Sequence, residues 1–347
     1  MLHKVFLTVM CIVLTICSLA AQRVEILGAG ATFPEPLYSR MFAEYNRLGN
    51  HVNYQGIGSG GGINQLVART VDFAGTDAIV APDVEERSGD TILHVPVVLG
   101  AVVITYNLQL SENRPLRFTS DLIADIFLGN IRNWNDRRIA EANPGITMPN
   151  LPITVVHRAD GSGTTFIFTE YLSKTNPTWA DRIGFGTAVN WPTSNHIGER
   201  GNPGVAASIN QTPGAIGYVE LIYAMSNNIP YGDVRNSSGH YITPSMDAVS
   251  LAANVEMPAD ARVTVTDTAH ERGYPISGFT WVLIFKEQNY NNRTQGHARA
   301  VVNLVRWMIN EGQSYAPELH YAPLSPAAQR IGQELLNSVT YNGRPLN

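Results

Sequence analysis

Apolar residues along this chain fall into two alternating patterns: unbroken runs, and longer segments in which they recur every three or four positions. Unbroken runs span residues 96–106 and 279–285, and a shorter strand-like segment spans 52–55. Long unbroken runs are typical of strands buried on both faces of a sheet. Strands that alternate with helices predict an α/β architecture.

Helical spacing predicts helices over residues 34–47, 62–69 and 164–172, and amphipathic helices over 298–309 and 326–339. Ser325 and Pro326 are typical N-cap and first-turn residues for the last of these. Thr32 is expected near the N-cap of the first helix, with Pro34 in its first turn. Each of the first three helices lies beside a glycine-rich segment.

The length of 347 residues suits two domains, each with its own core. The two long buried strands bracket a middle segment that is large enough for a domain. We therefore predict a discontinuous lobe I, made of residues 22–106 and 279–347, and a lobe II made of residues 107–278. The two amphipathic C-terminal helices would pack back onto lobe I.

The first residues have the pattern of a secretory signal peptide. His3 and Lys4 precede an apolar run over residues 5–16, and small residues follow it up to Ala21. The run is shorter than the ~20 residues that a membrane-spanning helix needs, which disfavours the alternative of a membrane anchor. We predict a signal peptide over residues 1–21, cleaved near Ala21, and an exported, periplasmic protein.

Cysteine usage agrees with export. Cys11 and Cys17 both lie in the segment predicted to be removed, so the mature chain would carry no disulfide. A lipid anchor at Cys17 is disfavoured, because the bulky Ile16 stands where a small residue usually precedes a lipidated cysteine.

Charge argues against a nucleic-acid partner. The chain has 24 basic and 29 acidic residues, and loss of Lys4 with the signal peptide leaves 23 against 29, a net charge of −6. Nucleic-acid binding needs a clustered basic surface. An anionic ligand would have to be captured by local donors, without help from the overall charge.

Three segments combine glycines with hydroxyl side chains beside a predicted helix: residues 28–34 (GAGATFP), 56–62 (GIGSGGG) and 158–165 (RADGSGTT). Glycine allows close approach of the backbone to a ligand, and a helix N-terminus offers free N–H donors. Arg158 adds a permanently charged fork suited to tetrahedral oxyanions, with Asp160 placed to hold it. The glycine loops, the Arg158 charge and four hydroxyl side chains together predict a cage for an oxyanion. The hydroxyls are those of Thr32, Ser59, Ser162 and Thr164. The alternative for Arg158 and Asp160 is a surface ion pair of little consequence.

Asp77 narrows the predicted ligand to an oxyanion that carries a proton. A carboxylate in an anion site repels the ligand unless the ligand carries a proton to donate to it. Phosphate near neutral pH carries one and sulfate does not, and a buried acceptor left unmet can discriminate by about 10⁴–10⁵. The alternative is that Asp77 is only a helix N-cap.

Two features of the sequence are also compatible with an enzyme. Gly56, Gly58 and Gly61 form a G-x-G-x-x-G after a predicted strand, which is a dinucleotide fingerprint, but free NAD is not expected outside the cytoplasm. Ser59 and Ser162 could be hydrolase nucleophiles, but neither lies in a G-x-S-x-G elbow. The sequence has no P-loop motif and no paired metal-ligand spacing.

The three segments, with residues 52–55 (VNYQ) and 71–73 (VDF), resemble the periplasmic phosphate-binding proteins (PstS type) of high-affinity phosphate ABC transporters. The resemblance extends over nearly the whole mature chain, through residues 127–136 (FLGNIRNWND), 213–220 (PGAIGYVE) and 274–276 (YPI). It implies a type II periplasmic-binding fold, in which two α/β lobes joined by two hinge strands enclose phosphate in a cleft.

The resemblance also implies the ligand contacts. Thr32 and the backbone N–H of Phe33 match the first loop, and Ser59 matches the second. Asp77 would accept the phosphate proton. Arg158, paired with Asp160, and the third-loop residues match the remaining contacts: Ser162, Gly163 and Thr164.

The implied function is an exported inorganic phosphate receptor that delivers its ligand to an inner-membrane ABC permease. Such a receptor is not an enzyme, needs no cofactor or metal, and works as a monomer. Two alternatives stay open, a secreted phosphohydrolase and a phosphate-responsive or adhesive surface protein that reuses the fold.

Overall fold

The structure is a computed structural model that describes residues 24–112 and 114–346. The predicted signal peptide lies outside the described residues. The strands are β1 (Glu25–Gly30), β2 (His51–Gly56), β3 (Phe73–Thr76), β4 (Ile92–Tyr106), β5 (Arg117–Phe118), β6 (Thr154–Arg158), β7 (His196–Glu199), β8 (Ala215–Glu220), β9 (Asp233–Arg235), β10 (Tyr241–Ile242), β11 (Ser277–Phe285), β12 (Thr340–Tyr341) and β13 (Arg344–Pro345).

The helices lie between these strands and at the C-terminal end. They are α2 (Glu35–Arg47), α3 (Ser59–Val67), α4 (Pro82–Ser88), α5 (Ser120–Phe127), α6 (Arg137–Ala142), α7 (Gly163–Thr175), α8 (Pro177–Arg182), α9 (Gly201–Gln211), α10 (Leu221–Ser226), α11 (Met246–Ala252), α12 (Gln295–Ile309) and α13 (Pro326–Asn337), with short 3-10 helices η2 (Glu311–Tyr315) and η3 (Pro317–Leu319). Among the described residues, no helix is both long and apolar enough to cross a membrane.

Eight strands form one continuous sheet in the order β2-β1-β3-β11-β4-β8-β6-β7. Strand β4 runs through both parts of this sheet, because residues 92–101 of β4 pair with β11 and residues 102–106 pair with β8. We call β2, β1, β3, β11 and residues 92–101 the first half, and residues 102–106, β8, β6 and β7 the second half. The predicted division at residues 106 and 279 falls close to the ends of β4 and β11 and stays a prediction.

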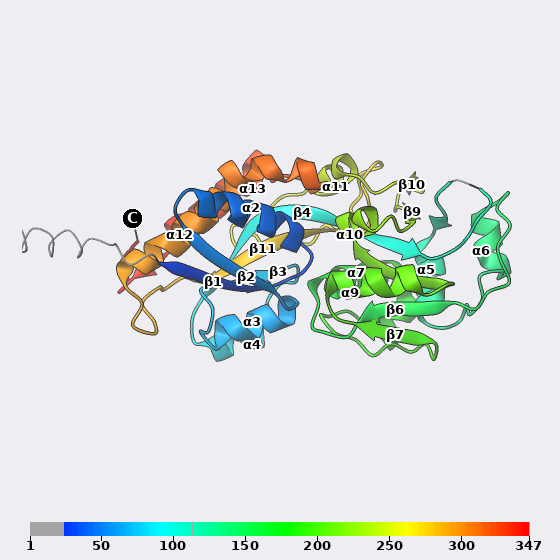
Figure 1. Ribbon diagram of the computed structural model, residues 1–347, viewed down its shortest axis with the longest axis horizontal. Coiled ribbons are helices and arrows are strands. Elements are labelled where there is room, and N and C mark those ends of the chain that lie inside the picture. Colours follow the sequence, from blue (N-terminus) through cyan, green and yellow to red (C-terminus); the bar gives the residue numbers. More distant parts are fainter. Residues whose placement is uncertain (1–23, 113, 347) are drawn as a thin grey trace, which may run out of the picture.

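Both long strands are buried along their whole length, as their unbroken apolar runs predict. In the first half, α2, α12 and α13 cover one side of the sheet while α3 and α4 cover the other (Figure 1). In the second half, α9 lies against β6 and β8, α7 lies against β8, and α5 packs on α7 (Figure 1). The core is therefore a sheet between two helical layers, as predicted for an α/β chain.

The starts of two helices matter for the site. Helix α2 begins at Glu35 with Pro34 as its N-cap, so Thr32 lies near the N-cap as predicted, although no side chain caps the helix. Helix α3 begins at Ser59, three residues earlier than predicted, because Gly58 has a φ of +86° that turns the chain directly into the helix. At the C-terminal end, Ser325 caps α13 as predicted, accepting the Ala328 N–H at 3.2 Å.

Parallel pairing decides where the loops gather. Strands β1, β2 and β3 are parallel to one another in the first half, and β6, β7 and β8 are parallel in the second half. Loops that follow parallel strands emerge at one edge, where ligands bind in open α/β sheets. The fold brings the two sets of carboxyl ends to face each other across the middle of the molecule.

Candidate functional site

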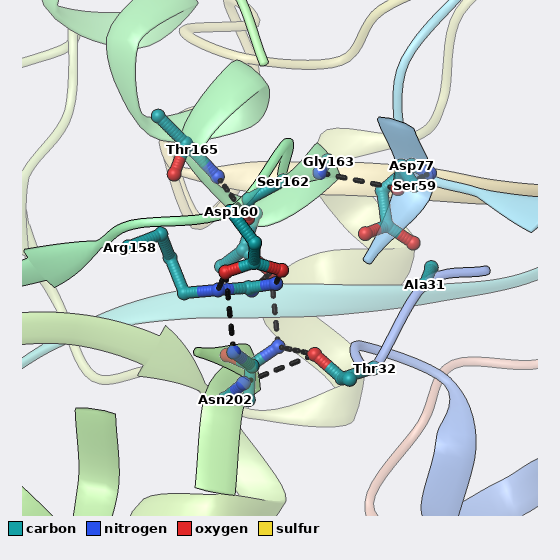
Figure 2. A network of polar contacts seen from close by, with 12 residues as sticks. Ala31, Thr32, Ser59, Asp77, Arg158, Asp160, Ser162, Gly163, Thr165 and Asn202 are labelled. Carbon is teal, nitrogen blue, oxygen red and sulfur yellow. Dashed lines mark hydrogen bonds and ion pairs between the residues drawn. The ribbon is translucent and has the colours of Figure 1, made fainter. Parts of the chain in front are cut away.

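The predicted residues converge where these two sets of loops meet. Thr32 follows β1, Ser59 follows β2 and Asp77 follows β3 in the first half. Arg158 ends β6 in the second half, and the third glycine segment runs from it into α7. Figure 2 shows these side chains around one region, although they come from four strands of the sheet.

The second and third glycine segments are in direct contact. The Gly60 N–H donates to the Gly161 carbonyl oxygen at 2.9 Å, and the Gly163 N–H donates to the Ser59 Oγ at 3.1 Å. A Cβ added to Gly163 would lie 2.5 Å from both the Asp77 Oδ2 and the Ser59 Oγ. Only glycine therefore allows the N-terminus of α7 to approach this closely.

Ser59 is fully buried at the start of α3. Its Oγ accepts two amide protons, from Gly163 at 3.1 Å and from Asp77 at 3.3 Å. A hydroxyl has two lone pairs and one proton. With both lone pairs occupied, the Ser59 O–H can act only as a donor.

The two threonines are held in the same way. The Thr32 Oγ1 accepts from the Asn202 backbone N–H at 3.0 Å and from its Nδ2 at 3.1 Å. The Thr164 Oγ1 accepts from the Asn202 Nδ2 at 3.0 Å and from the Arg158 Nη1 at 3.4 Å. Each threonine therefore also keeps only its O–H proton to offer.

Arg158 and Asp160 form a buried pair. The Arg158 Nε donates to the Asp160 Oδ1 at 2.7 Å and Nη2 donates to Oδ2 at 2.5 Å, a two-point contact that fixes the guanidinium plane. The Gly201 N–H donates to the same carboxylate at 3.2 Å. Burial opposes ionisation of Asp160, but its hydrogen bonds to Arg158 and the Arg158 charge outweigh it and lower the pKa. The predicted pairing is confirmed, and it is not a surface ion pair.

Asp77 is the acidic group of the site, and it caps no helix, because α4 begins five residues later with Ala81 as its N-cap. Its Oδ1 accepts the Thr280 hydroxyl of β11 at 2.8 Å. Burial raises the pKa of Asp77 to about 7, against the Thr280 hydrogen bond and the Arg158 charge, which lower it. Its carboxyl can thus be a proton acceptor or a proton carrier near neutral pH.

The remaining predicted residues shape the site through the backbone. The Ser162 Oγ accepts the Thr165 N–H at 3.0 Å, which makes Ser162 the N-cap of α7. Phe33 is fully buried, and its carbonyl oxygen accepts the Tyr321 hydroxyl at 2.6 Å. These contacts hold the first and third loops in place.

Sequence reasoning missed Asn202 and Thr280. Asn202 follows β7 at the start of α9 and contacts both threonines, while Thr280 lies in the middle of the buried strand β11. The sequence predicts no strand before Asn202, so nothing marks it as a loop residue at a strand end. For Thr280 the signal is a polar residue inside the apolar run over residues 279–285.

The geometry disfavours both enzyme-like interpretations. The ring nitrogens of His157 are engaged by the Arg158 carbonyl oxygen at 2.9 Å and by His196 at 2.7 Å, so this histidine is not poised against either serine. Beside Gly58, the Asp160 Oδ2 would lie 2.3 Å from an added Cβ, so this side chain occupies the space that a pyrophosphate would need against the glycine loop. Among the described residues, no group of three or more His, Cys, Asp or Glu could hold a metal ion.

The comparisons agree with this architecture. A family model described as a PBP superfamily domain matches residues 18–311. The chain is 41% identical over 309 residues to the phosphate-binding protein PstS of Xylella fastidiosa (strain 9a5c), covering 88% of this chain and 83% of that protein. It is 37% identical over 311 residues to the PstS of Pasteurella multocida (strain Pm70), covering 88% of each.

A solved structure has the same fold. A high-affinity periplasmic phosphate-binding protein bound with phosphate matches with a TM-score of 0.71 and 21% identity, covering 93% of this chain and 100% of that one. Fold and site thus define a binding protein of the PBP superfamily, and the predicted periplasmic-binding fold is confirmed. Within that class, the chain belongs to the PstS family of phosphate-binding proteins.

Proposed function

We propose that this chain binds inorganic phosphate between the two halves of its sheet and delivers it to an inner-membrane ABC permease. The chain would act as an exported, periplasmic and monomeric receptor. Its membership of the PstS family and a phosphate-bound structure of the same fold support this function. The proposed ligand contacts are Thr32, Phe33, Ser59, Asp77, Arg158, Asp160, Ser162, Gly163 and Thr164, with Asp160 acting through Arg158.

One observation carries the proposal: donors and acceptor occur in the ratio that protonated phosphate needs. Ser59, Thr32 and Thr164 can only donate, because protein N–H groups occupy their lone pairs. Arg158 adds a buried positive charge. The Asp77 Oδ1 is bonded to Thr280, and its Oδ2 would accept the proton of the ligand. An oxyanion with several acceptor oxygens and one proton satisfies all of them.

Delivery to a permease requires that the receptor has two distinguishable states. The first half supplies Thr32, Ser59 and Asp77, and the second half supplies Arg158 and Thr164. A ligand held from both sides favours the arrangement in which the halves are together, which is hinge closure. The permease would then recognise the closed, phosphate-bound form.

Calorimetric titration of the purified chain with phosphate and with sulfate at pH 8 tests the proposal. We expect one phosphate bound per chain and no measurable heat with sulfate. Equal binding of the two anions, or binding of neither, would contradict it.

A second measurement separates a receptor from a hydrolase. Incubation with a chromogenic phosphate monoester should release no phosphate beyond the rate of buffer alone, because neither Ser59 nor Ser162 has a histidine base among its hydrogen-bond partners. Sustained turnover that is lost in Ser59→Ala or Ser162→Ala would favour the phosphohydrolase alternative.

A further inference from the structure

Asn202 is a fully buried side chain whose polar groups are all engaged within the site. It is the second residue of α9, next to Gly201, whose φ of +67° turns the chain into the helix. Its backbone N–H and Nδ2 both reach the Thr32 Oγ1 (Figure 2). The Nδ2 also reaches the Thr164 Oγ1. One amide thus bridges a hydroxyl of the first half and a hydroxyl of the second half.

The orientation of this amide is determined by its fourth contact. The Asn202 Oδ1 accepts the Glu220 backbone N–H at 2.9 Å. A backbone N–H can only donate, so the oxygen of the amide must face Glu220 and the NH₂ group must face the two threonines. The Asn202 hydrogen bonds to both threonines therefore run in one direction only.

Resting on the proposed phosphate-receptor function, we propose that Asn202 is a positioning and specificity-determining residue that makes Thr32 and Thr164 obligate donors to the ligand. By filling lone pairs on both hydroxyls, it turns their protons toward the bound oxyanion. Because the two threonines belong to opposite halves, the same amide aligns the donors only when the halves are together. Donor polarity and closure are thus coupled through one side chain.

The chemical consequence is specific to the NH₂ group. In Asn202→Asp the shape is kept, but the new carboxylate accepts hydrogen bonds from the threonine hydroxyls instead of donating to them. Both O–H protons are then drawn away from the ligand, and a negative charge is added beside an anion site. In Asn202→Ala the hydroxyls lose a partner but keep the freedom to donate, so the smaller change in side-chain chemistry should cost less affinity.

Calorimetric titration with inorganic phosphate at pH 8 tests this inference on wild type, N202D, N202A and N210D. Asn210 lies on the exposed side of the same helix and is the matched control for the Asn-to-Asp change. We expect N202D to weaken phosphate binding by at least about 100-fold and N202A by about 10-fold, since each lost hydrogen bond to a charged ligand is worth about a tenfold factor or more. N210D should bind as wild type does.

A double-mutant cycle distinguishes positioning from general damage to the fold. If Asn202 acts through the Thr32 hydroxyl, N202D should cost at least about fivefold less affinity in a Thr32→Val background than in the wild type, because one of the two misdirected donors is already absent. An equal cost in both backgrounds would overturn the inference. Should N202D fail to fold, as judged by its thermal unfolding, the same cycle is run with N202A.

The outcomes separate this inference from the function on which it rests. Wild type that binds phosphate together with N202D that binds within threefold of it overturns the role of Asn202 and leaves the receptor function intact. Wild type that does not bind phosphate overturns the proposed function itself and the inference with it.

Discussion

The Ser59 hydroxyl oxygen accepts the Gly163 backbone N–H at 3.1 Å, although 104 residues separate the two in the chain. Ser59 begins α3 and Gly163 begins α7, so the N-termini of two helices from opposite halves of the sheet meet at the site. The partial positive charges of two helix N-termini repel each other, and an anion between them removes the repulsion. The contact therefore favours an arrangement that holds an oxyanion.

Gly163→Ala should weaken phosphate binding by at least about tenfold. The new methyl group would lie 2.5 Å from the Asp77 Oδ2 and the Ser59 Oγ, so α7 must withdraw from α3 and the halves cannot approach fully. Because alanine is the better helix former, α7 itself should not be destabilised.

Titration with phosphate, together with thermal unfolding, checks this prediction. Gly296→Ala is the matched control, since Gly296 also lies in the first turn of a helix, α12, and an added Cβ would have no neighbour closer than 3.8 Å. Wild-type affinity in Gly163→Ala would show that the close approach is not needed for binding.

Asp77→Asn should reduce the preference for phosphate over sulfate by about 100-fold or more at pH 8. The carboxylate needs a proton from the ligand, which sulfate lacks, whereas the amide can donate its own proton to a sulfate oxygen. Side-by-side titration with both anions measures the ratio, and the exposed Asp181→Asn of α8 is the control. An unchanged ratio would mean that Asp77 does not face the ligand.

The wild type should exclude sulfate less strictly as the pH falls. Burial raises the pKa of Asp77 to about 7, so its carboxyl is ionised and repels sulfate above that pH, and is neutral and able to donate below it. We expect sulfate binding to strengthen from pH 8 to pH 5 in the wild type and to stay flat in Asp77→Asn. Sulfate affinity that is independent of pH in both proteins would contradict this role.

Arg158→Lys should weaken phosphate binding by about tenfold or more although the positive charge is kept. The guanidinium is held by two hydrogen bonds to Asp160, at 2.7 Å and 2.5 Å, and it also reaches Thr164, and an ammonium group cannot make this forked set of contacts. Arg158→Ala should be weaker still. The ranking by titration is wild type, lysine, alanine, and an alanine variant that binds as well as the wild type would place Arg158 outside the site.

Glu220→Gln should stabilise the protein at pH 8 by about 1–3 kcal/mol and leave its stability unchanged near pH 4. Glu220 is fully buried, its Oε2 accepts the Ile222 N–H at 2.8 Å, and its Oε1 has no hydrogen-bond partner among the described residues. Burial raises its pKa well above 4.5. Because the pKa of Glu220 is higher in the folded than in the unfolded state, the protein has its full stability below the unfolded-state pKa. It loses stability as the pH rises from there toward the folded-state pKa. Glutamine does not ionise, so the variant avoids this loss.

Denaturant unfolding at both pH values checks this prediction, with the exposed Glu334→Gln of α13 as the control. A variant that is less stable than the wild type at pH 8 would show that the carboxylate itself is needed at this position.

Local signals were sufficient for much of the fold. The strands at 96–106 and 279–285 correspond to β4 and β11, and the Ser325 cap of α13 is confirmed, because unbroken apolar runs and N-cap chemistry act over a few residues. Thr32 shows what local signals leave open. By position it could cap a helix, but its hydroxyl is taken by Asn202, 170 residues further along the chain.

For this protein the sequence alone determined the candidate chemistry: three glycine and hydroxyl loops, one arginine with its carboxylate partner, and one acid, Asp77, predicted to accept a proton from the ligand. The sequence shows this chemistry directly, because the flexibility of glycine, the hydroxyl group and the side-chain charge are properties of the residue type and do not depend on the fold. Only the tertiary structure decided the direction of each hydrogen bond, by bringing Asn202 to Thr32 and Thr280 to Asp77. Whether a hydroxyl donates or accepts depends on which groups fill its lone pairs, and those groups come from segments that are distant in the chain. Asn202 comes from the start of α9 in the second half, and Thr280 comes from β11, the sheet neighbour of β3.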